Sequence, residues 1–256
     1  MTRRQSEAGF AQILVIAALA VLAAVMTAAV SMSRLGAQQI SALDARVVAD
    51  VTLDSGLRLL RAALDDPDDD LEVRAMAAPV TTRIGDEQVE LAIAGEGGKI
   101  DVLRSDMSLV ERFSRNAGLN QDELAQLVTA LSDRRAVGDD VGAMDAVQLA
   151  LAAAVGFAAI EESFTRFGSD RIDPAFASLA VLRAIPDLGD AEARRIAATS
   201  SSERAPYTAL SRYFASGSRR FMLIAKSSAG ARGTFERRLP IELTNSGGVI
   251  ELDRPR

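Results

Sequence analysis

The sequence predicts an α+β fold, in which a long N-terminal helix accompanies an antiparallel sheet and a helical region is inserted between two halves of that sheet. Three observations support this. An uncharged apolar run lies close to the N-terminus. Apolar residues alternate with polar ones, as in strands, within 80–98 and 220–252. Residues 99–219, between these two regions, carry apolar side chains at helical spacing.

The first element is a helix long enough to cross a membrane. Arg3 and Arg4 precede an uncharged run from Ala8 to Ser33. At 1.5 Å per residue this run is about 39 Å long, more than the roughly 30 Å of a bilayer's hydrocarbon core. The two arginines predict a cytoplasmic N-terminus and therefore a non-cytoplasmic body. The alternative is a cleaved signal peptide, whose apolar region usually covers only about 7–15 residues.

Helical periodicity continues past the apolar run and favours an anchor over a signal peptide. Apolar residues recur mostly every three to five positions at Leu35, Ile40, Leu43, Val47, Val51 and Leu57. Polar residues lie between them, so the helix is expected to leave the membrane and become amphipathic up to about Leu64. The acidic segment Asp65–Asp70, which contains Pro67, is expected to end it.

The two β regions are expected to join in one sheet packed on the long helix. In the first, Val80–Ile84 and Val89–Ile93 flank Gly85, which suits a hairpin turn because glycine readily adopts positive φ. The second region holds three expected strands, Phe221–Lys226, Thr234–Leu243 and Val249–Leu252. Pro240 has no N–H to donate, so its strand is expected at an edge or with a bulge.

The inserted region contains two similar helix–turn–helix units, 99–135 and 171–205. Each begins with a basic residue followed by Ile-Asp and continues through a Ser-Leu pair to a turn that contains glycine and leucine. Between the units, Ala146–Ile160 is almost wholly apolar and alanine-rich. It is too short for a membrane span and is expected to be a buried helix, with an amphipathic surface helix as the alternative.

The composition argues against most enzyme classes. The chain has no cysteine and no histidine, which excludes thiolate catalysis, Ser-His-Asp triads and the commonest zinc ligands. Ser200–Ser202 have no candidate base nearby in sequence and are interpreted as a linker. The formal charge of −6 opposes broad contact with nucleic acid, whose affinity depends on Lys and Arg. A non-enzymatic protein is expected.

The junction Ala8-Gly9-Phe10, placed after a short basic leader and before a long apolar helix, resembles the prepilin-peptidase site of type IV pilins and type II secretion pseudopilins. The resemblance implies a leader at 1–9, cleavage after Gly9, methylation of Phe10 as the first mature residue, and a stem helix over 10–64. Most members of the family carry Glu at the fifth mature position, where this chain has Leu14. The minor pseudopilin K typically lacks that Glu. A lipid-facing leucine without further meaning is the alternative.

The body also resembles the type II secretion minor pseudopilin K family. Gly97-Gly98-Lys99-Ile100-Asp101 is similar to the Gly-Lys-Ile-Asn segment of that family. Asp173-Pro174, followed by Val181-Leu182 and Ile185-Pro186, resembles the start of its later module. The two helical units then correspond to SAM-like, or helix-hairpin-helix, modules.

The resemblance implies a tip subunit of the pseudopilus that takes part in protein export across the outer membrane. It implies a single-pass protein of the bacterial inner membrane, with a periplasmic body. The expected partners are other minor pseudopilins in a hetero-oligomeric complex, the prepilin peptidase, and a secreted substrate or the outer-membrane secretin. Two alternatives remain: a membrane-anchored helix-hairpin-helix DNA receptor for DNA uptake, and a minor pilin of a type IV pilus.

Two further sites are candidates. Asp133, Asp139, Asp140 and Asp145 surround two glycines, and several carboxylates on a flexible loop suit calcium, although the spacing is not that of an EF-hand. The K family has an acidic segment in the corresponding place, but its Asp-Trp pair is absent here. A solvated acidic loop is the favoured alternative. Ile185–Gly189 resembles a helix-hairpin-helix turn, but Asp187 replaces the first glycine and disfavours phosphate binding.

Overall fold

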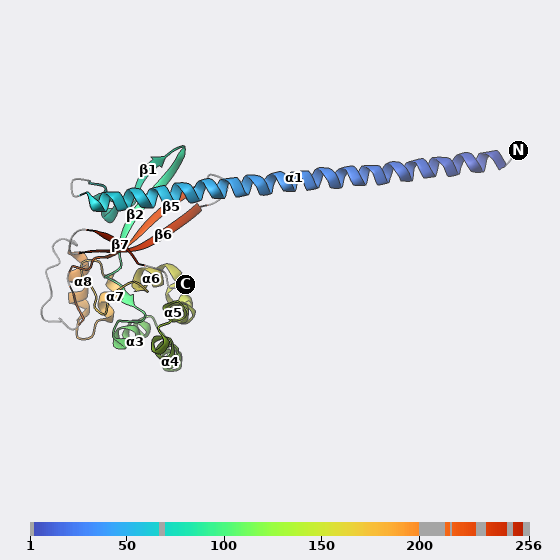
Figure 1. Ribbon diagram of the computed structural model, residues 1–256. Helices are drawn as coiled ribbons and strands as arrows, with labels where there is room; N and C mark the ends of the chain where they lie inside the picture. The colour runs from blue at the N-terminus through green and yellow to red at the C-terminus, as the bar shows by residue number, and fades with distance from the viewer. Residues whose placement is uncertain are drawn as a thin grey trace.

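The computed structural model describes residues 3–66, 70–199, 213–215, 217–228, 234–244 and 248–252. Figure 1 shows one long helix, α1 (Arg3–Asp65), that extends far beyond a two-part body. The predicted helix end near Leu64 is confirmed, and the helix begins before the expected stem, at Arg3. A short helix that was not predicted, α2 (Leu71–Ala77), follows and leads into the sheet.

The two β regions form one antiparallel sheet, as predicted. Its order is β1-β2-β5-β6-β7. The strands are β1 (Val80–Ile84), β2 (Glu87–Gly95), β5 (Arg220–Ser228), β6 (Thr234–Leu243) and β7 (Val249–Glu251). Gly85 has φ +61° in the first hairpin, as expected for its turn. The two halves of the sheet meet where β2 pairs with β5, from Val89 opposite Ser227 to Gly95 opposite Phe221.

The position of Pro240 differs from the expectation. β6 lies inside the sheet, between β5 and β7, and its pairing with β5 includes Pro240 opposite Met222. The Pro240 carbonyl accepts a bond from the Leu252 backbone N–H (2.9 Å). Because proline cannot donate the reciprocal bond, the ladder between β6 and β7 ends one residue earlier, at Ile241 opposite Glu251. Pro240 therefore terminates the neighbouring strand without placing β6 at an edge.

The C-terminal part of α1 packs on one face of the sheet. Leu53, Leu57 and Leu60 are buried there among strand residues that include Leu91, Leu223 and Ile241. Gly56 permits the close approach, since a Cβ at this position would lie 2.9 Å from the Leu91 side chain. Two ion pairs connect the helix to the last strands, Asp54 with Arg237 (2.7 Å) and Arg61 with Glu251 (2.5 Å). The body is thereby fixed to the last third of the helix.

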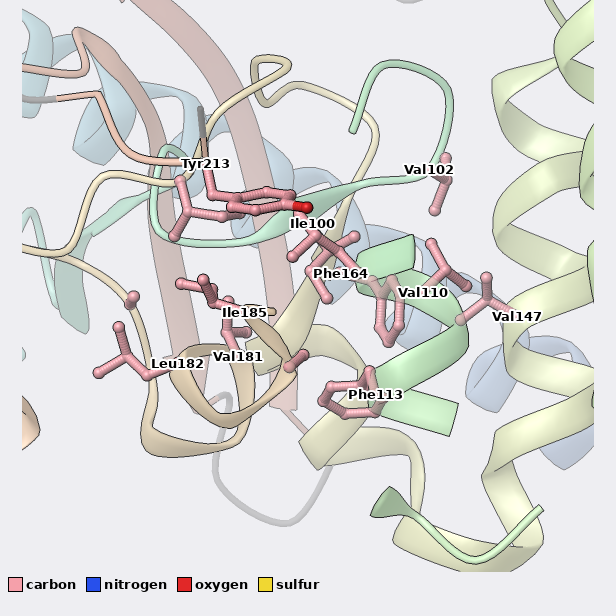
Figure 2. Packing of buried hydrophobic residues seen from close by; sticks show 14 of the residues in the cluster. Ile100, Val102, Val110, Phe113, Val147, Phe164, Val181, Leu182, Ile185 and Tyr213 are labelled. Carbon is pink, nitrogen blue, oxygen red and sulfur yellow. The ribbon is translucent and has the colours of Figure 1, made fainter. Parts of the chain in front are cut away.

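The helical insertion has a core of its own. It contains α3 (Met107–Asn116), α4 (Gln121–Val137), α5 (Asp140–Val155), α6 (Phe157–Ser163), α7 (Leu179–Ala184) and α8 (Asp190–Ala198). Two short strands, β3 (Ile100–Asp101) and β4 (Phe164–Thr165), pair in parallel. Figure 2 shows Phe113 and Phe164 beside Val110 and Ile100, and the two rings meet edge to face with centroids 4.9 Å apart.

The predicted helix–turn–helix units correspond to α3 with α4 and to α7 with α8. In the first, Gly118 has φ +96° three residues before α4. In the second, Asp187 has φ +65° at a similar distance before α8. The two turns therefore share a left-handed residue followed by a leucine. The expected second unit extends to residue 205, and its part from 200 onward lies outside the described residues.

The prediction of one buried helix over Ala146–Ile160 is wrong. The chain breaks at Gly156 (φ +81°), so the stretch is divided between α5 and α6. Val147 and Leu151 are buried at helical spacing, whereas Leu149 is 88% exposed. The alternative, an amphipathic surface helix, is right only in part, because one face of α5 is buried but its exposed face is also largely apolar. The alanine-rich sequence does not indicate which helix positions are buried and which are exposed, because alanine is compatible with both faces of a helix.

Candidate assembly surface

The described part of the chain contains one helix long and apolar enough to cross a membrane, the stretch Leu19–Asp65 of α1. Its most apolar window is not buried against any other part of the protein. The large side chains along it, such as Leu22 and Met26, are more than half exposed. This segment fits a single-pass membrane anchor, because a lipid environment would cover a surface that water would otherwise have to solvate.

The apolar surface of α1 continues beyond the expected span and onto the body. Ile40, Leu43, Val47 and Val51 are 60–70% exposed. Their spacing of three or four residues places them in one line along the helix, on the side away from the sheet. We call these four residues the stem stripe. Leu57, which the sequence places in the same apolar series, lies instead on the face buried by the sheet. The helix thus has two apolar faces, only one of which the chain itself covers.

A groove lies on a different side of α1 from the stem stripe, where the helix faces the sheet. It has a volume of about 490 Å³ and lies between α1 and the start of β6. Ala37, Ser41 and Ala45 line it on α1, and Phe235 lines it on β6. Small side chains at four-residue intervals allow helix backbones to approach closely. Because the groove lies on the sheet side of α1, the candidate assembly surface is the stem stripe alone.

The residues predicted to be processed, Gly9 and Phe10, lie within α1, as does Leu14. The helical backbone therefore runs without a break from the expected leader into the expected stem. Cleavage after Gly9 and the role of Leu14 stay predictions.

Two of the four aspartates of the predicted calcium site have other roles. Asp139 is the N-cap of α5: its Oδ1 accepts a bond from the Gly142 N–H (2.8 Å), and its Oδ2 pairs with Arg134 (2.8 Å). Asp140 is buried and lies 3.6 Å from Arg166. Asp133 and Asp145 are exposed. Among the described side chains, no three carboxylates gather closely enough to hold a metal ion. Calcium binding stays a prediction, and the geometry favours capping and ion pairing.

The cap at Asp139 should make stability depend on pH. The Gly142 N–H, and then Arg134, lower the pKa of the Asp139 carboxyl below its usual value. The stabilisation is present above the unfolded-state pKa of about 3.9 and is lost as the pH falls through the folded-state value. In thermal unfolding followed by circular dichroism, Asp139→Asn should melt close to the native chain at pH 7. It should lose less of its melting temperature on acidification, because Asn caps without titrating. Equal losses of melting temperature in the two proteins on acidification would contradict this role of the Asp139 carboxylate.

The helix-hairpin-helix turn of the second unit is poorly suited to nucleic acid. Asp187 adopts the left-handed conformation expected of the glycine it replaces, so the turn itself is formed. However, the nearby arginines are neutralised by acidic neighbours. Asp190 pairs with Arg183 (2.6 Å) and with Arg194 (2.9 Å), and Glu192 pairs with Arg195 (2.6 Å). These pairs remove the cations on which phosphate binding would depend.

A buried ion pair that the sequence analysis did not anticipate connects the insertion to the sheet. Glu96, 2% exposed, follows β2 directly. One carboxylate oxygen accepts from the Lys99 ammonium (2.6 Å), and the other accepts from the Thr165 hydroxyl on β4. The group lines a cavity of about 410 Å³ between the sheet and α5–α6. In the sequence, this ion pair is indicated only by a glutamate within a glycine-rich loop. The sequence does not show that the glutamate is buried.

The fold defines a class of protein: a chain with one long N-terminal helix that fits a membrane anchor, with the end of that helix packed on an antiparallel sheet and a helical insertion between the halves of the sheet. No known protein family matches the sequence, and no curated protein matches it. Among solved structures, the chain is similar to a chain of the GspK-GspI-GspJ complex from the type 2 secretion system of enterotoxigenic Escherichia coli. The TM-score is 0.53 at 10% identity, over 86% of this chain and 97% of that chain. The predicted pseudopilin resemblance is thereby confirmed at the level of the fold.

Proposed function

We propose that the chain is a non-enzymatic minor pseudopilin of a type II secretion system. The observation that carries the proposal is the stem stripe: a second apolar face on α1, continuous with the membrane-spanning segment and uncovered by the chain itself. The stems of neighbouring subunits would cover this face in a bundle. The shared fold with a chain of the GspK-GspI-GspJ complex supports the same assignment.

Within such an assembly, the chain would act as the tip subunit. Leu14 stands where most pseudopilins carry Glu, whose carboxylate compensates a neighbouring terminal amine inside an apolar bundle. A subunit with no neighbour above it does not need that charge. The helical insertion adds bulk to the side of the sheet opposite α1, where a subunit inside a filament would need room for its neighbours (Figure 1).

The proposal also includes a location and partners. The N-terminus would be cytoplasmic, the stem would cross the inner membrane, and the body would lie in the periplasm. The prepilin peptidase would remove the leader. Other minor pseudopilins would form the hetero-oligomeric tip, and a secreted substrate or the outer-membrane secretin would contact the body.

Processing gives the first prediction. The purified mature protein should lack residues 1–9 and should begin with a methylated Phe10, which intact-protein mass spectrometry and N-terminal sequencing can establish. Replacing Gly9 with a bulky residue such as Leu should leave the full leader attached. An intact Met1 in the unsubstituted protein, or cleavage at another bond, would contradict this part of the proposal.

Cysteine crosslinking tests assembly, because the chain has no cysteine and a single introduced thiol is unique. Ile40→Cys should crosslink in cells to a matching cysteine in the stem of another minor pseudopilin. The matched control is Gln38→Cys, which is exposed at the same height but points about 160° away around the helix. Equal crosslinking yields at the two positions would contradict the proposal. Crosslinks to subunits of a type IV pilus would favour the alternative that the chain is a minor pilin. Tight DNA binding that weakens with salt would favour the alternative that it is a DNA receptor.

A further inference from the structure

A cavity of about 250 Å³ lies where the insertion meets the sheet, and three arginines from separate elements line it. Arg104 precedes α3, Arg166 follows β4, and Arg220 begins β5. The other lining residues are Leu103, Gly138, Asp140, Phe167 and Leu252. We call this space the arginine cavity. The side chain of Arg104 is 52% exposed, so solvent reaches the cavity.

Two of these guanidinium groups converge on one acceptor. The buried Gly168 carbonyl accepts a hydrogen bond from Arg104 Nη1 (3.0 Å) and another from Arg220 Nη1. The two cations are therefore held close together, and like charges at short range repel each other. An anion bound beside both of them would lower this cost.

The third guanidinium, that of Arg166, has donors without acceptors. Its side chain is only 26% exposed, yet it makes no hydrogen bond with any residue that the structure describes. The Asp140 carboxylate lies 3.6 Å from it, too far for a hydrogen bond, and the Phe167 ring lies against it with its centroid 5.2 Å from the guanidinium carbon. Because a guanidinium has several N–H donors, Arg166 keeps unused hydrogen-bonding capacity beside the cavity.

Acidic side chains compensate these arginines unequally. Glu242 is hydrogen-bonded to Arg220 (3.1 Å), whereas the Asp101 and Asp140 carboxylates each lie 3.6 Å from their arginines. Of the three acids only Asp140 lines the cavity itself. Since the three acids balance the three arginines, the cavity favours an anion of single charge. A dianion such as phosphate is disfavoured because Asp140 would lie beside it.

We propose that the arginine cavity binds a carboxylate group of another polypeptide, held by Arg104, Arg166 and Arg220. A carboxylate matches a guanidinium in geometry, because two parallel N–H···O bonds can form between them. The bound carboxylate would use the donors that Arg166 leaves free and would lie beside the two cations that share the Gly168 carbonyl. The inference does not depend on how the stem assembles.

The remaining walls suit the carbon chain that carries the carboxylate. Leu103, Phe167 and Leu252 give the cavity an apolar side. Sites for drug-sized ligands usually have roughly 300–1,000 Å³, so this smaller cavity would be filled by a single residue. The carboxylate can come from an acidic side chain or from the end of a chain, and matched probes distinguish these two sources.

Titration of the full chain in a nonionic detergent tests the inference, with binding followed through the NMR signals of the arginine Nε–H groups. N-acetyl-leucine presents a chain end on an apolar residue, the α-amide of N-acetyl-glutamate presents an acidic side chain, and N-acetyl-leucinamide is the uncharged control. We expect the better of the two acids to shift the signals of Arg104, Arg166 and Arg220 together. It should bind at least about tenfold more tightly than the uncharged control, acetate or inorganic phosphate.

Substitutions in the cavity complete the test. Arg166→Lys keeps a cation beside the Asp140 carboxylate but removes the forked donors, so it should weaken binding of the acid at least about tenfold and leave thermal unfolding unchanged. Should that variant unfold, Arg104→Gln replaces a more exposed side chain and should weaken binding to a similar extent. The matched control is Arg115→Lys, at an exposed arginine of α3 that pairs with Glu111 (3.0 Å) outside the cavity. It should bind the acid as the native chain does.

Four results would overturn the proposal. The first is equal affinity for the acids and the uncharged control, or no saturable shift with either acid. The second is binding of acetate or phosphate that is as tight as binding of the acids. The third is unchanged binding in the folded cavity variants. The fourth is a loss of binding in the Arg115→Lys control that equals the loss in those variants.

Discussion

Replacing Gly98 with alanine should lower the free energy of unfolding by about 3 kcal/mol or more. A Cβ at this position would lie 2.1 Å from the backbone carbonyl carbon of Phe176 and 2.5 Å from the backbone nitrogen of Ala177. Both are main-chain atoms, so no side-chain rotation can relieve the overlap. The segment that must shift also carries Asp173, whose carboxylate accepts bonds from the backbone N–H groups of Ala175 (2.9 Å) and Ser218 (2.7 Å).

Thermal or denaturant unfolding followed by circular dichroism measures this effect. Gly36→Ala is the matched control, because nothing lies within 4 Å of a Cβ at that helical position. It should leave unfolding of the body unchanged and slightly favour the helix. If both substitutions had the same small effect, the close approach of these two segments would not exist in the protein.

A charge on the stem stripe should abolish assembly while the body stays folded. In the bundle proposed above, Leu43 and Val47 would be buried against neighbouring stems, and an unpaired carboxylate there costs several kcal/mol. We expect the double variant Leu43→Asp, Val47→Asp to reduce stem crosslinking from Ile40→Cys at least about tenfold and to reduce secretion to background. The reason is that each buried carboxylate costs several kcal/mol, whereas a loss of about 1.4 kcal/mol already lowers an association constant tenfold.

The control for this prediction is the double variant Gln38→Asp, Ala42→Asp, which places the same two charges at exposed positions on the opposite side of α1. It should retain crosslinking and secretion. Circular dichroism should show the same melting for all variants, because both stripe residues are exposed in the isolated chain. Secretion that survives the double substitution would mean that the stripe is not an assembly surface, whatever the fold of the chain.

Local patterns were sufficient for most of the elements. The long helix was predictable because charge is absent from Ala8 to Ser33 and because apolar residues continue at helical spacing. β1 and β6 have the predicted bounds, since alternation and the Gly85 turn are local signals. The prediction over Ala146–Ile160 was wrong because an alanine-rich segment leaves the buried face undetermined until neighbouring helices select it.

The candidate assembly surface was only partly predictable. Ile40, Leu43, Val47 and Val51 were recognisable as an apolar series, but so was Leu57, which the sheet buries. Spacing alone assigns residues to a helix and does not say which face a distant strand will cover. The same limit applies to Glu96, because its partner Thr165 lies 69 residues away.

The sequence by itself determined that this chain has a long apolar N-terminal helix that fits a membrane anchor, that its body is α+β, and that thiol and histidine chemistry are absent, since these depend on composition and on periodicity within single elements. Tertiary structure decided which face of the stem remains apolar and uncovered, and that Asp139 serves as a helix cap. These depend on contacts between segments far apart in the chain. Burial is a property of such contacts and not of the local sequence.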